Sequence, residues 1–319
     1  MDLNRDIKQS PIIGVSGIGG GTASYINYGT KAPSGADVMY DYFFSSEASA
    51  INCSSSNTAT FQPSGSAGSI GKCHNALDAF VDHSQQKIWG AYSTVSSYAW
   101  NNGGNTYGNS SFYAISGVQT NVAGHTTSGL SGAGRGITMA VLSDNTPVLV
   151  VSRSGLNQFH FFNYPSGTYI GYQITNIGTN QPNEGGDWAG LAWDGGDHLL
   201  VAARGDSQVY AYSLPSSTSA ISSSSAISTV AKWTTSHAVQ YGMVYGGGNR
   251  LYITENTNNG NVTQFLLSGT ASQVGYSGSS SVVTTYQLGV QNYSLMMDYK
   301  NRKLILGGFN NNQYLIVGE

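Results

Sequence analysis

A three-strand pattern that recurs along the chain is the feature that most constrains its fold. Each copy has a short apolar strand, a turn with Asp, Asn or Gly, a second apolar strand, another polar turn and a third strand. The clearest copies lie at 188–213 (WAGLAWD, LLVAA, QVYAYS), 240–266 (QYGMVY, RLYIT, NVTQFL) and 294–317 (SLMMD, KLIL, QYLIV). Short apolar runs separated by tight turns predict antiparallel hairpins.

Looser copies of the pattern precede these three. They lie at 137–162 (ITMAVL, PVLVV, QFHFF), 77–115 (LDAFVD, KIWGA, SFYAI) and 38–61 (VMYD, ASAI, TATF). The residues that mark the first turn of each copy are Asp41, Asp82, Ser143, Asp194, Gly246 and Asp298. Their spacing is about 50 residues, which is typical of a propeller blade made of short strands.

Burial explains why such copies join into a ring. One small sheet has two apolar faces and cannot cover both, whereas sheets packed face to face around an axis cover each other and leave only short edges. We therefore predict an all-β β-propeller of about six blades over residues 37–319. Five full blades plus an N-terminal arm is the alternative count, and a pair of β-sandwiches is disfavoured by the regular period.

The repeat also predicts which side chains are buried. Equivalent positions on the inner strands should face neighbouring sheets: Val81, Leu142, Trp193, Val244 and Met297. Small residues near these strands, namely Gly190, Gly242 and Ala140, suit crowding around a central axis.

The blade pattern resembles that of six-bladed propellers of the NHL and YVTN class, whose blades carry an apolar strand, an Asp, Gly or Asn turn and an L-x-V-A-x strand. The resemblance runs from about Asp37 to the C-terminus. It implies a fold and no particular function, because propellers include lyases, hydrolases, receptors and scaffolds.

Charge is sparse. Only 9% of the residues are charged and the formal net charge is −3, so we expect no attraction to nucleic acid. Met1 to Asp6 is polar and no secretory signal follows, and no apolar run reaches the ~20 residues of a membrane span.

The N-terminal 36 residues differ from the repeats. Residues 8–26 (KQSPIIGVSGIGGGTASYI) contain too many glycines for a regular strand and too many apolar side chains to leave in water. This Gly-rich opening resembles the starts of some phage and virus-like virion proteins. We expect an irregular arm that docks on another subunit through its apolar residues Ile12, Ile13, Val15, Ile18, Tyr25 and Ile26.

Residues with catalytic or metal-binding chemistry are scattered. No Gly-x-Ser-x-Gly elbow stands between a strand and a helix, and no close pair of carboxylates is evident. Cys53 and Cys73 can form a disulfide in an oxidising compartment, but two thiols do not make a zinc site. We expect no cofactor and no metal.

One set of polar residues has a common place in the repeats. Each stands just upstream of a first strand, so a propeller would gather them around one mouth of its channel: Asp37, His74, Asn75, Arg135, Asp187, His237 and Asn292. Polar loops are the simplest explanation. The functional explanation is ligand binding at this mouth. The two histidines among these residues could also act as acid and base.

These features favour a non-enzymatic structural or recognition module. The expected setting is a virion or the extracellular space, as a spike, fibre or decoration protein of a phage particle that binds neighbouring subunits, a glycan or a host receptor. A lyase or hydrolase with a mouth histidine is the first alternative. An extracellular adhesin or lectin is the second.

Overall fold

The fold is described by a computed structural model of the chain. The described residues are 58–61, 78–82, 87–91, 95–99, 101–107, 110–114, 119–121, 134–153, 158–164, 166, 168–175, 188–203, 206–222, 226–227, 229–255, 261–269, 276–286, 292–298, 303–308 and 314–318. Apart from one 3-10 turn at Thr218–Ala220, their regular secondary structure is all β. The all-β prediction is confirmed.

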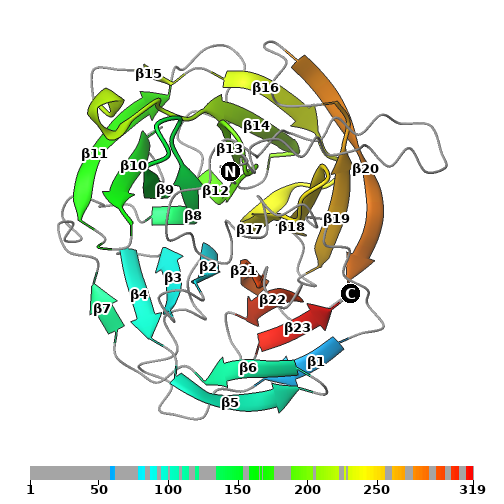
Figure 1. The fold of residues 1–319 in the computed structure, drawn as a ribbon. Coiled ribbons are helices and arrows are strands. Elements are labelled where there is room, and N and C mark those ends of the chain that lie inside the picture. Colours follow the sequence, from blue (N-terminus) through cyan, green and yellow to red (C-terminus); the bar gives the residue numbers. More distant parts are fainter. Residues whose placement is uncertain are drawn as a thin grey trace, which may run out of the picture.

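Among the described residues, five blades of four antiparallel strands stand around a common axis, as in a propeller (Figure 1). Two neighbouring blades join at their outer strands into one eight-stranded sheet, and another blade carries a short fifth strand. In each blade the strands lie side by side, from the innermost strand at the axis to the outermost strand at the rim. Blade 1 contains β2 (Asp78–Asp82), β3 (Lys87–Ala91), β4 (Val95–Ala99) and β7 (Gln119–Asn121). Blade 2 contains β8 (Gly134–Val141), β9 (Pro147–Arg153), β10 (Gln158–Asn163) and β11 (Tyr169–Thr175).

The remaining three blades follow the same order. Blade 3 contains β12 (Trp188–Trp193), β13 (His198–Ala203), β14 (Gln208–Ser213) and β16 (Thr229–Thr234). Blade 4 contains β17 (Val239–Tyr245), β18 (Arg250–Glu255), β19 (Val262–Leu267) and β20 (Tyr276–Tyr286). Blade 5 contains β21 (Asn292–Asp298), β22 (Lys303–Gly308), β23 (Tyr314–Gly318) and, outermost, β1 (Thr58–Phe61).

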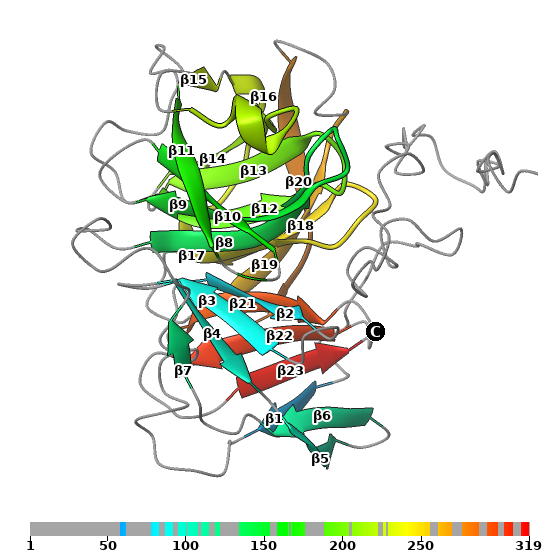
Figure 2. The ribbon, with the colours of Figure 1, turned by 60° about the vertical axis from the view of Figure 1, so that its left-hand side comes forward.

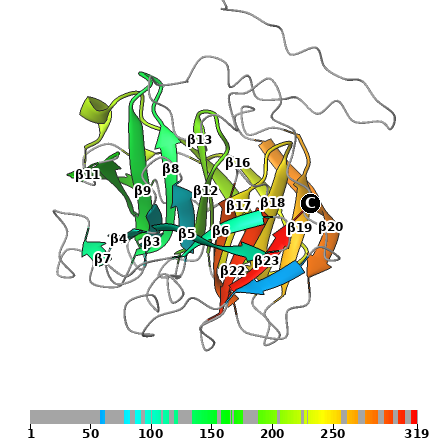
Figure 3. The same ribbon diagram turned by 60° about the horizontal axis from the view of Figure 1, so that its bottom comes forward.

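The inner strands close the ring. β8 contacts β12, β12 contacts β17, β17 contacts β21, β21 contacts β2, and β2 contacts β8. Figure 3 shows blades 2 and 4 standing on either side of β12. Five inner strands are thus enough to complete the circle, and of the two predicted blade counts the described sheets agree with five.

Two strand assignments differ from the sequence prediction. The segment at 58–61 is not the third strand of a first blade, because Thr58 pairs with Val317 and Phe61 with Tyr314 in blade 5. Its predicted companions at 38–41 and 48–51 lie outside the described residues. A strand from near the start of the chain therefore closes the last blade, a long-range pairing that no local repeat encodes.

The strands of the copy at 77–115 also differ from the prediction. Its third strand is β4, which pairs with β3, whereas β6 (Ser110–Ala114) pairs with β5 (Asn101–Tyr107) in a separate hairpin. This hairpin lies at the periphery beside β1 (Figures 1 and 2). The inserted hairpin explains why the first-turn markers Asp82 and Ser143 are the most widely spaced neighbours.

Outer strands also link neighbouring blades. β16 of blade 3 pairs in parallel with β20 of blade 4, from Ala231 with Tyr276 to Thr234 with Ser279. Just before it, β15 (Ala226–Ile227) pairs in parallel with β11 of blade 2. One stretch of chain therefore ties three consecutive blades together at their outer edges.

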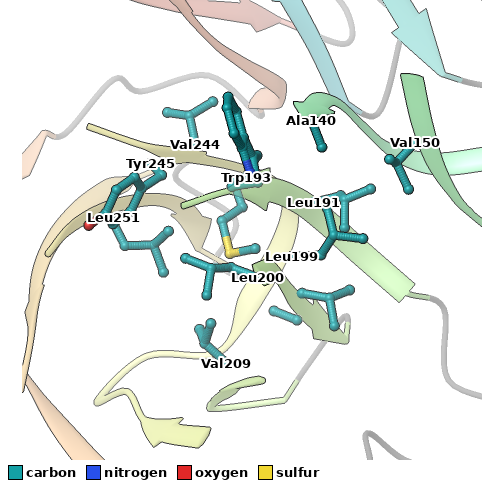
Figure 4. Close-up of a cluster of buried hydrophobic side chains, with 14 of the residues drawn as sticks. Ala140, Val150, Leu191, Trp193, Leu199, Leu200, Val209, Val244, Tyr245 and Leu251 are labelled. Carbon is teal, nitrogen blue, oxygen red and sulfur yellow. The ribbon is translucent and has the colours of Figure 1, made fainter. Parts of the chain in front are cut away.

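The core lies between the blades, as predicted. Leu142, Trp193, Val244 and Met297 are all buried, and Val81 lies on β2. Figure 4 shows Leu191 and Leu200 of blade 3 between Ala140 and Val150 of blade 2 and Val244 and Leu251 of blade 4. Truncating such a side chain to alanine costs about 2–5 kcal/mol, so these interfaces supply much of the stability of the ring.

Glycines let the inner strands approach one another. A Cβ on Gly136 would lie 2.5 Å from Cβ of Leu191, and one on Gly242 would lie 2.6 Å from Cβ of Leu295. Gly190 faces Met243 in the same way. The crowding expected at Gly190 and Gly242 is confirmed, and Gly136 is the equivalent residue of blade 2.

The Asp that marks the first turn has a local structural role at Asp194. Its Oδ1 accepts hydrogen bonds from the backbone N–H groups of Gly196 (2.7 Å) and His198 (3.2 Å), and its Oδ2 lies 2.8 Å from His198 Nδ1. Nearby, Trp193 Nε1 donates to the Gly196 carbonyl at 2.9 Å. A short carboxylate that satisfies turn N–H groups explains why Asp recurs at this point of the repeat.

Candidate functional site

The starts of the inner strands form one end of the ring, which we call the mouth. Because every blade repeats the same antiparallel order, all inner strands run in the same direction and begin at the same end. Arg135 lies near the start of β8, Asn292 is the first residue of β21, and His237 stands just before β17. The fold thus brings these three predicted residues to the mouth.

The other predicted site residues lie outside the described part of the chain. This holds for the mouth residues Asp37, His74, Asn75 and Asp187, for the cysteines Cys53 and Cys73, and for the arm residues Ile12, Ile13, Val15, Ile18, Tyr25 and Ile26. Of the predicted mouth residues, only His237 has described side-chain contacts.

His237 sits in a short loop that blade 3 holds in place. Thr235 N–H donates to the Ser207 carbonyl at 2.8 Å, which ties the loop to the connection between β13 and β14. The Thr235 hydroxyl donates to the His237 carbonyl at 2.8 Å. The imidazole is therefore presented from an anchored backbone while 40% of its side chain stays exposed.

Beneath the imidazole lies a buried carboxylate. Glu255, the last residue of β18, is only 3% exposed, and its Oε1 lies 3.7 Å from His237 Nδ1. Thr263 donates its hydroxyl hydrogen to the same Oε1, and its own oxygen lies 3.0 Å from the Thr285 hydroxyl. Because the Thr263 hydroxyl donates its hydrogen to Glu255, the Thr285 hydroxyl must donate to Thr263. The two hydroxyl groups therefore form a hydrogen-bond chain that ends at the carboxylate.

Both polar neighbours of the imidazole lie at the same ring nitrogen. The Ser236 hydroxyl lies 3.0 Å from Nδ1, the atom that also faces Glu255. A serine–histidine–acid relay needs the serine on one ring nitrogen and the acid on the other. Ser236, His237 and Glu255 therefore do not form a nucleophilic triad in this arrangement, and the carboxylate instead orients the ring.

Asn261 completes the cluster. Its carbonyl accepts the Glu255 N–H at 2.9 Å, so the two residues are cross-strand partners at the mouth ends of β18 and β19. Side chains of such a pair lie on the same face of a sheet. The amide oxygen Oδ1 of Asn261 is buried and has no hydrogen-bond partner. Together His237, Glu255, Asn261 and Thr263 form what we call the blade 4 cluster.

The position of Thr263 recurs as a polar site in the two preceding blades. Thr263 pairs with Ile253, as Tyr210 does with Val201 and His160 with Val151. The three residues occupy equivalent places in β19, β14 and β10.

Each of these equivalent residues is held by its own local hydrogen bonds. Tyr210 donates to Gln208 Oε1 at 2.7 Å. His160 Nε2 lies 3.2 Å from Gln158 Oε1, and its Nδ1 lies 3.2 Å from the Tyr169 hydroxyl. The third strand of each of these blades thus carries a buried polar residue that is satisfied by neighbours on its own blade.

Burial perturbs two of the groups in blade 3. It raises the pKa of the Asp206 carboxyl above its usual range, although hydrogen bonds from Ser207, Tyr210 and Gln208 act in the opposite direction. Burial, followed by the charge of Asp206, raises the pKa of the Tyr210 hydroxyl. Tyr210 therefore remains a hydrogen-bond donor at physiological pH.

Sequence reasoning missed Glu255 and Asn261. The available signal was an acidic residue that directly ends an apolar strand (LYITE at 251–255) in a chain with few charges. Such a residue is rarely buried without a partner. Its pairing with His237 joins the end of one strand to the loop before another, which the repeat alone does not indicate.

The described residues offer neither a metal-binding cluster nor a membrane-spanning helix. They contain no group of three or more His, Cys, Asp or Glu side chains that could hold a metal ion. In the same residues no helix has the length and apolar character of a membrane span.

Comparison with solved structures returns a β-propeller domain, a set of WD40 repeats and a glutaminyl cyclase, each at low identity. The β-propeller domain of Myceliophteria thermophila Cps50 (Swd1) matches with a TM-score of 0.40 and 9% identity, over 73% of this chain and 66% of that one. The WD40 repeats of RRP9 match with a TM-score of 0.40 and 9% identity, over 76% and 79%. Myxococcus xanthus glutaminyl cyclase matches with a TM-score of 0.46 and 9% identity, over 81% and 93%.

No protein-family model matches the sequence, and no curated protein matches it. Assignment of the chain as a β-propeller therefore rests on its own sheet order and ring closure.

Proposed function

We propose that this chain is a non-enzymatic recognition module that binds a partner through the mouth of its propeller. The observation that carries the proposal is the blade 4 cluster: a buried carboxylate and an unpartnered amide oxygen under a half-exposed imidazole. Recognition sites place a few polar groups in this way to fix a ligand, and the ring supplies a rigid support for them.

The exposed surface supports a role in an assembly. Among the described residues that are exposed, Asp144 and Asp197 are the only charged ones, and serine and threonine dominate the remainder. A soluble domain ordinarily has about 25–35% charged residues on its surface. A neutral, hydroxyl-rich surface suits contact with neighbouring subunits or with glycans.

We propose a virion as the setting, with the chain acting as a spike, fibre or decoration protein of a phage particle. The support is the composition of the first 36 residues, whose apolar side chains need a surface to bury against, together with the low charge of the chain. In this proposal residues 1–36 dock on a neighbouring subunit, and the propeller at 37–319 presents its mouth to a host receptor or glycan.

Three measurements test this function. Immunogold electron microscopy of particles from the source should label assembled particles; finding the protein only as a free monomer would contradict the virion role. A glycan array and a host-cell binding assay, each with the wild type and Glu255→Gln, should show binding that the variant weakens. Binding that is the same in both proteins would remove the mouth as the recognition site.

A second candidate is a lyase or hydrolase, favoured by the contact between His237 and Glu255. A carboxylate at Nδ1 leaves Nε2 as the atom available for proton transfer. An activity screen with His237→Asn beside the wild type tests this, since turnover that survives the substitution would exclude the histidine.

A further inference from the structure

We propose that the blade 4 cluster binds a primary ammonium group, such as the side chain of a lysine on the partner protein. The inference rests on the proposed recognition function and names the chemical group that the mouth takes. Its basis is an excess of hydrogen-bond acceptors, with no permanent cation among the described groups of the cluster.

Glu255 is the first acceptor. Its described partners all contact Oε1: the Thr263 hydroxyl and the Nδ1 face of His237. Glu255 is 3% exposed, and a buried carboxylate is ordinarily paired with a cation. The imidazole is a cation only when it is protonated, and its Nδ1 is shared with Ser236. A bound cation would therefore supply the partner that a buried carboxylate ordinarily has.

Asn261 is the second acceptor. Its Oδ1 is buried without a hydrogen-bond partner, a state that is unfavourable for a polar group. Because Glu255 and Asn261 are cross-strand partners, their side chains share one face of blade 4. One donor group placed between them would satisfy both.

The number and kind of acceptors favour an ammonium over other cations. An ammonium has three donors on one small charge, which suits acceptors that come from separate residues. A guanidinium prefers both oxygens of one carboxylate, but Thr263 already occupies Oε1 of Glu255. Calcium takes about six to eight oxygen ligands, more than the cluster supplies.

The imidazole of His237 lies where a ligand would enter the site. It is 40% exposed, whereas Glu255 and Thr263 are buried, and it lies at the mouth where a partner would approach. Its anchored backbone keeps it beside the carboxylate. A lysine side chain is long enough to pass the ring while its methylene groups stay in contact with it.

The test uses the full chain and two short peptides, acetyl-Gly-Lys-Gly-amide and the same peptide with an acetylated lysine Nζ. NMR of the histidine imidazole resonances should show saturable shifts at His237 with the first peptide, with millimolar affinity, and none with the second. Glu255→Gln should weaken binding about tenfold or more. Asp197→Asn, which removes a carboxylate at the opposite end of the blades, is the matched control and should leave binding unchanged.

Asn261→Leu is a second site variant, included in case Glu255→Gln does not fold. Its amide oxygen has no hydrogen bond to lose, so this variant should stay folded and still bind the peptide more weakly. Equal shifts with the acetylated peptide, or unchanged affinity in both site variants, would overturn the proposal. Shifts of His237 that require added calcium or zinc instead of the peptide would identify a metal site and also overturn it.

These outcomes are distinguishable from failure of the proposed function. Particle labelling and host-cell binding use the whole protein and do not presuppose which chemical group the mouth binds. A negative peptide result with positive host-cell binding would refute only the choice of ligand.

Discussion

Gly242 on β17 faces Leu295 on β21 so closely that a Cβ on the glycine would lie 2.6 Å from Cβ and 2.8 Å from the backbone nitrogen of the leucine. The same relationship joins Gly136 to Leu191 and Gly190 to Met243. Because the obstacle includes backbone atoms, it cannot be relieved by a side-chain rotation. The spacing of the inner ring therefore depends on the missing side chain.

Gly242→Ala should destabilise the protein by about 1–3 kcal/mol, because overpacking forces the two inner strands apart. Chemical denaturation followed by tryptophan fluorescence measures the change. Gly171→Ala is the control, since its Cβ would approach Ile221 Cγ2 at 3.3 Å, an atom of a side chain that can shift. Equal losses in the two variants would show that inner-ring spacing is not special.

Thr263→Val should cost about 1–3 kcal/mol, because it removes the hydroxyl donor of a buried carboxylate and leaves the shape nearly unchanged. Thr285→Val keeps the bond between Thr263 and Glu255 and should cost less. The free energies of unfolding of both variants decide the matter. If Thr285→Val proves the more damaging, the hydroxyl chain does not act through Glu255.

Asp206→Asn should change how stability depends on pH. Burial raises the pKa of Asp206, so between its unfolded and folded pKa values the native state binds more protons than the unfolded state. Stability of the wild type contributed by this group therefore falls as the pH rises through that window. The variant has no ionisable group at this position, so it should lack this decrease in stability with rising pH.

Urea denaturation of both proteins from acid to neutral pH measures the effect. The two free-energy curves should separate as the pH rises, with the variant gaining relative to the wild type. Parallel curves would mean that the folded state does not perturb this carboxyl. Asparagine can still accept from Tyr210, which lies 3.5 Å from Asp206 Oδ2, so the packing should be retained.

Removing residues 1–62 should lower the melting temperature sharply, because it deletes β1, the outer strand of blade 5 that pairs with β23. Removing residues 1–36 should leave the melting temperature nearly unchanged and abolish assembly. Calorimetry and analytical ultracentrifugation compare the two truncated chains. Unfolding of the shorter deletion would instead assign the arm to the ring itself.

The sequence by itself determined the parts of this protein that are local. The first-strand repeat predicted the inner strands, and buried Trp193 and Val244 lie where that repeat places them, because alternation and turn chemistry act over a few residues. Its first-turn Asp is explained by hydrogen bonds within five residues, from Asp194 to His198.

Tertiary structure alone decided the features that join distant residues. Thr58–Phe61 resembles a blade strand in sequence, yet its partner is β23 near the other end of the chain, and with this pairing the described strands form five blades. His237 and Glu255 meet only because a loop and a strand end converge at the mouth. Strand pairing and side-chain convergence depend on how the ring closes, and closure is a property of all the blades together that no single repeat contains.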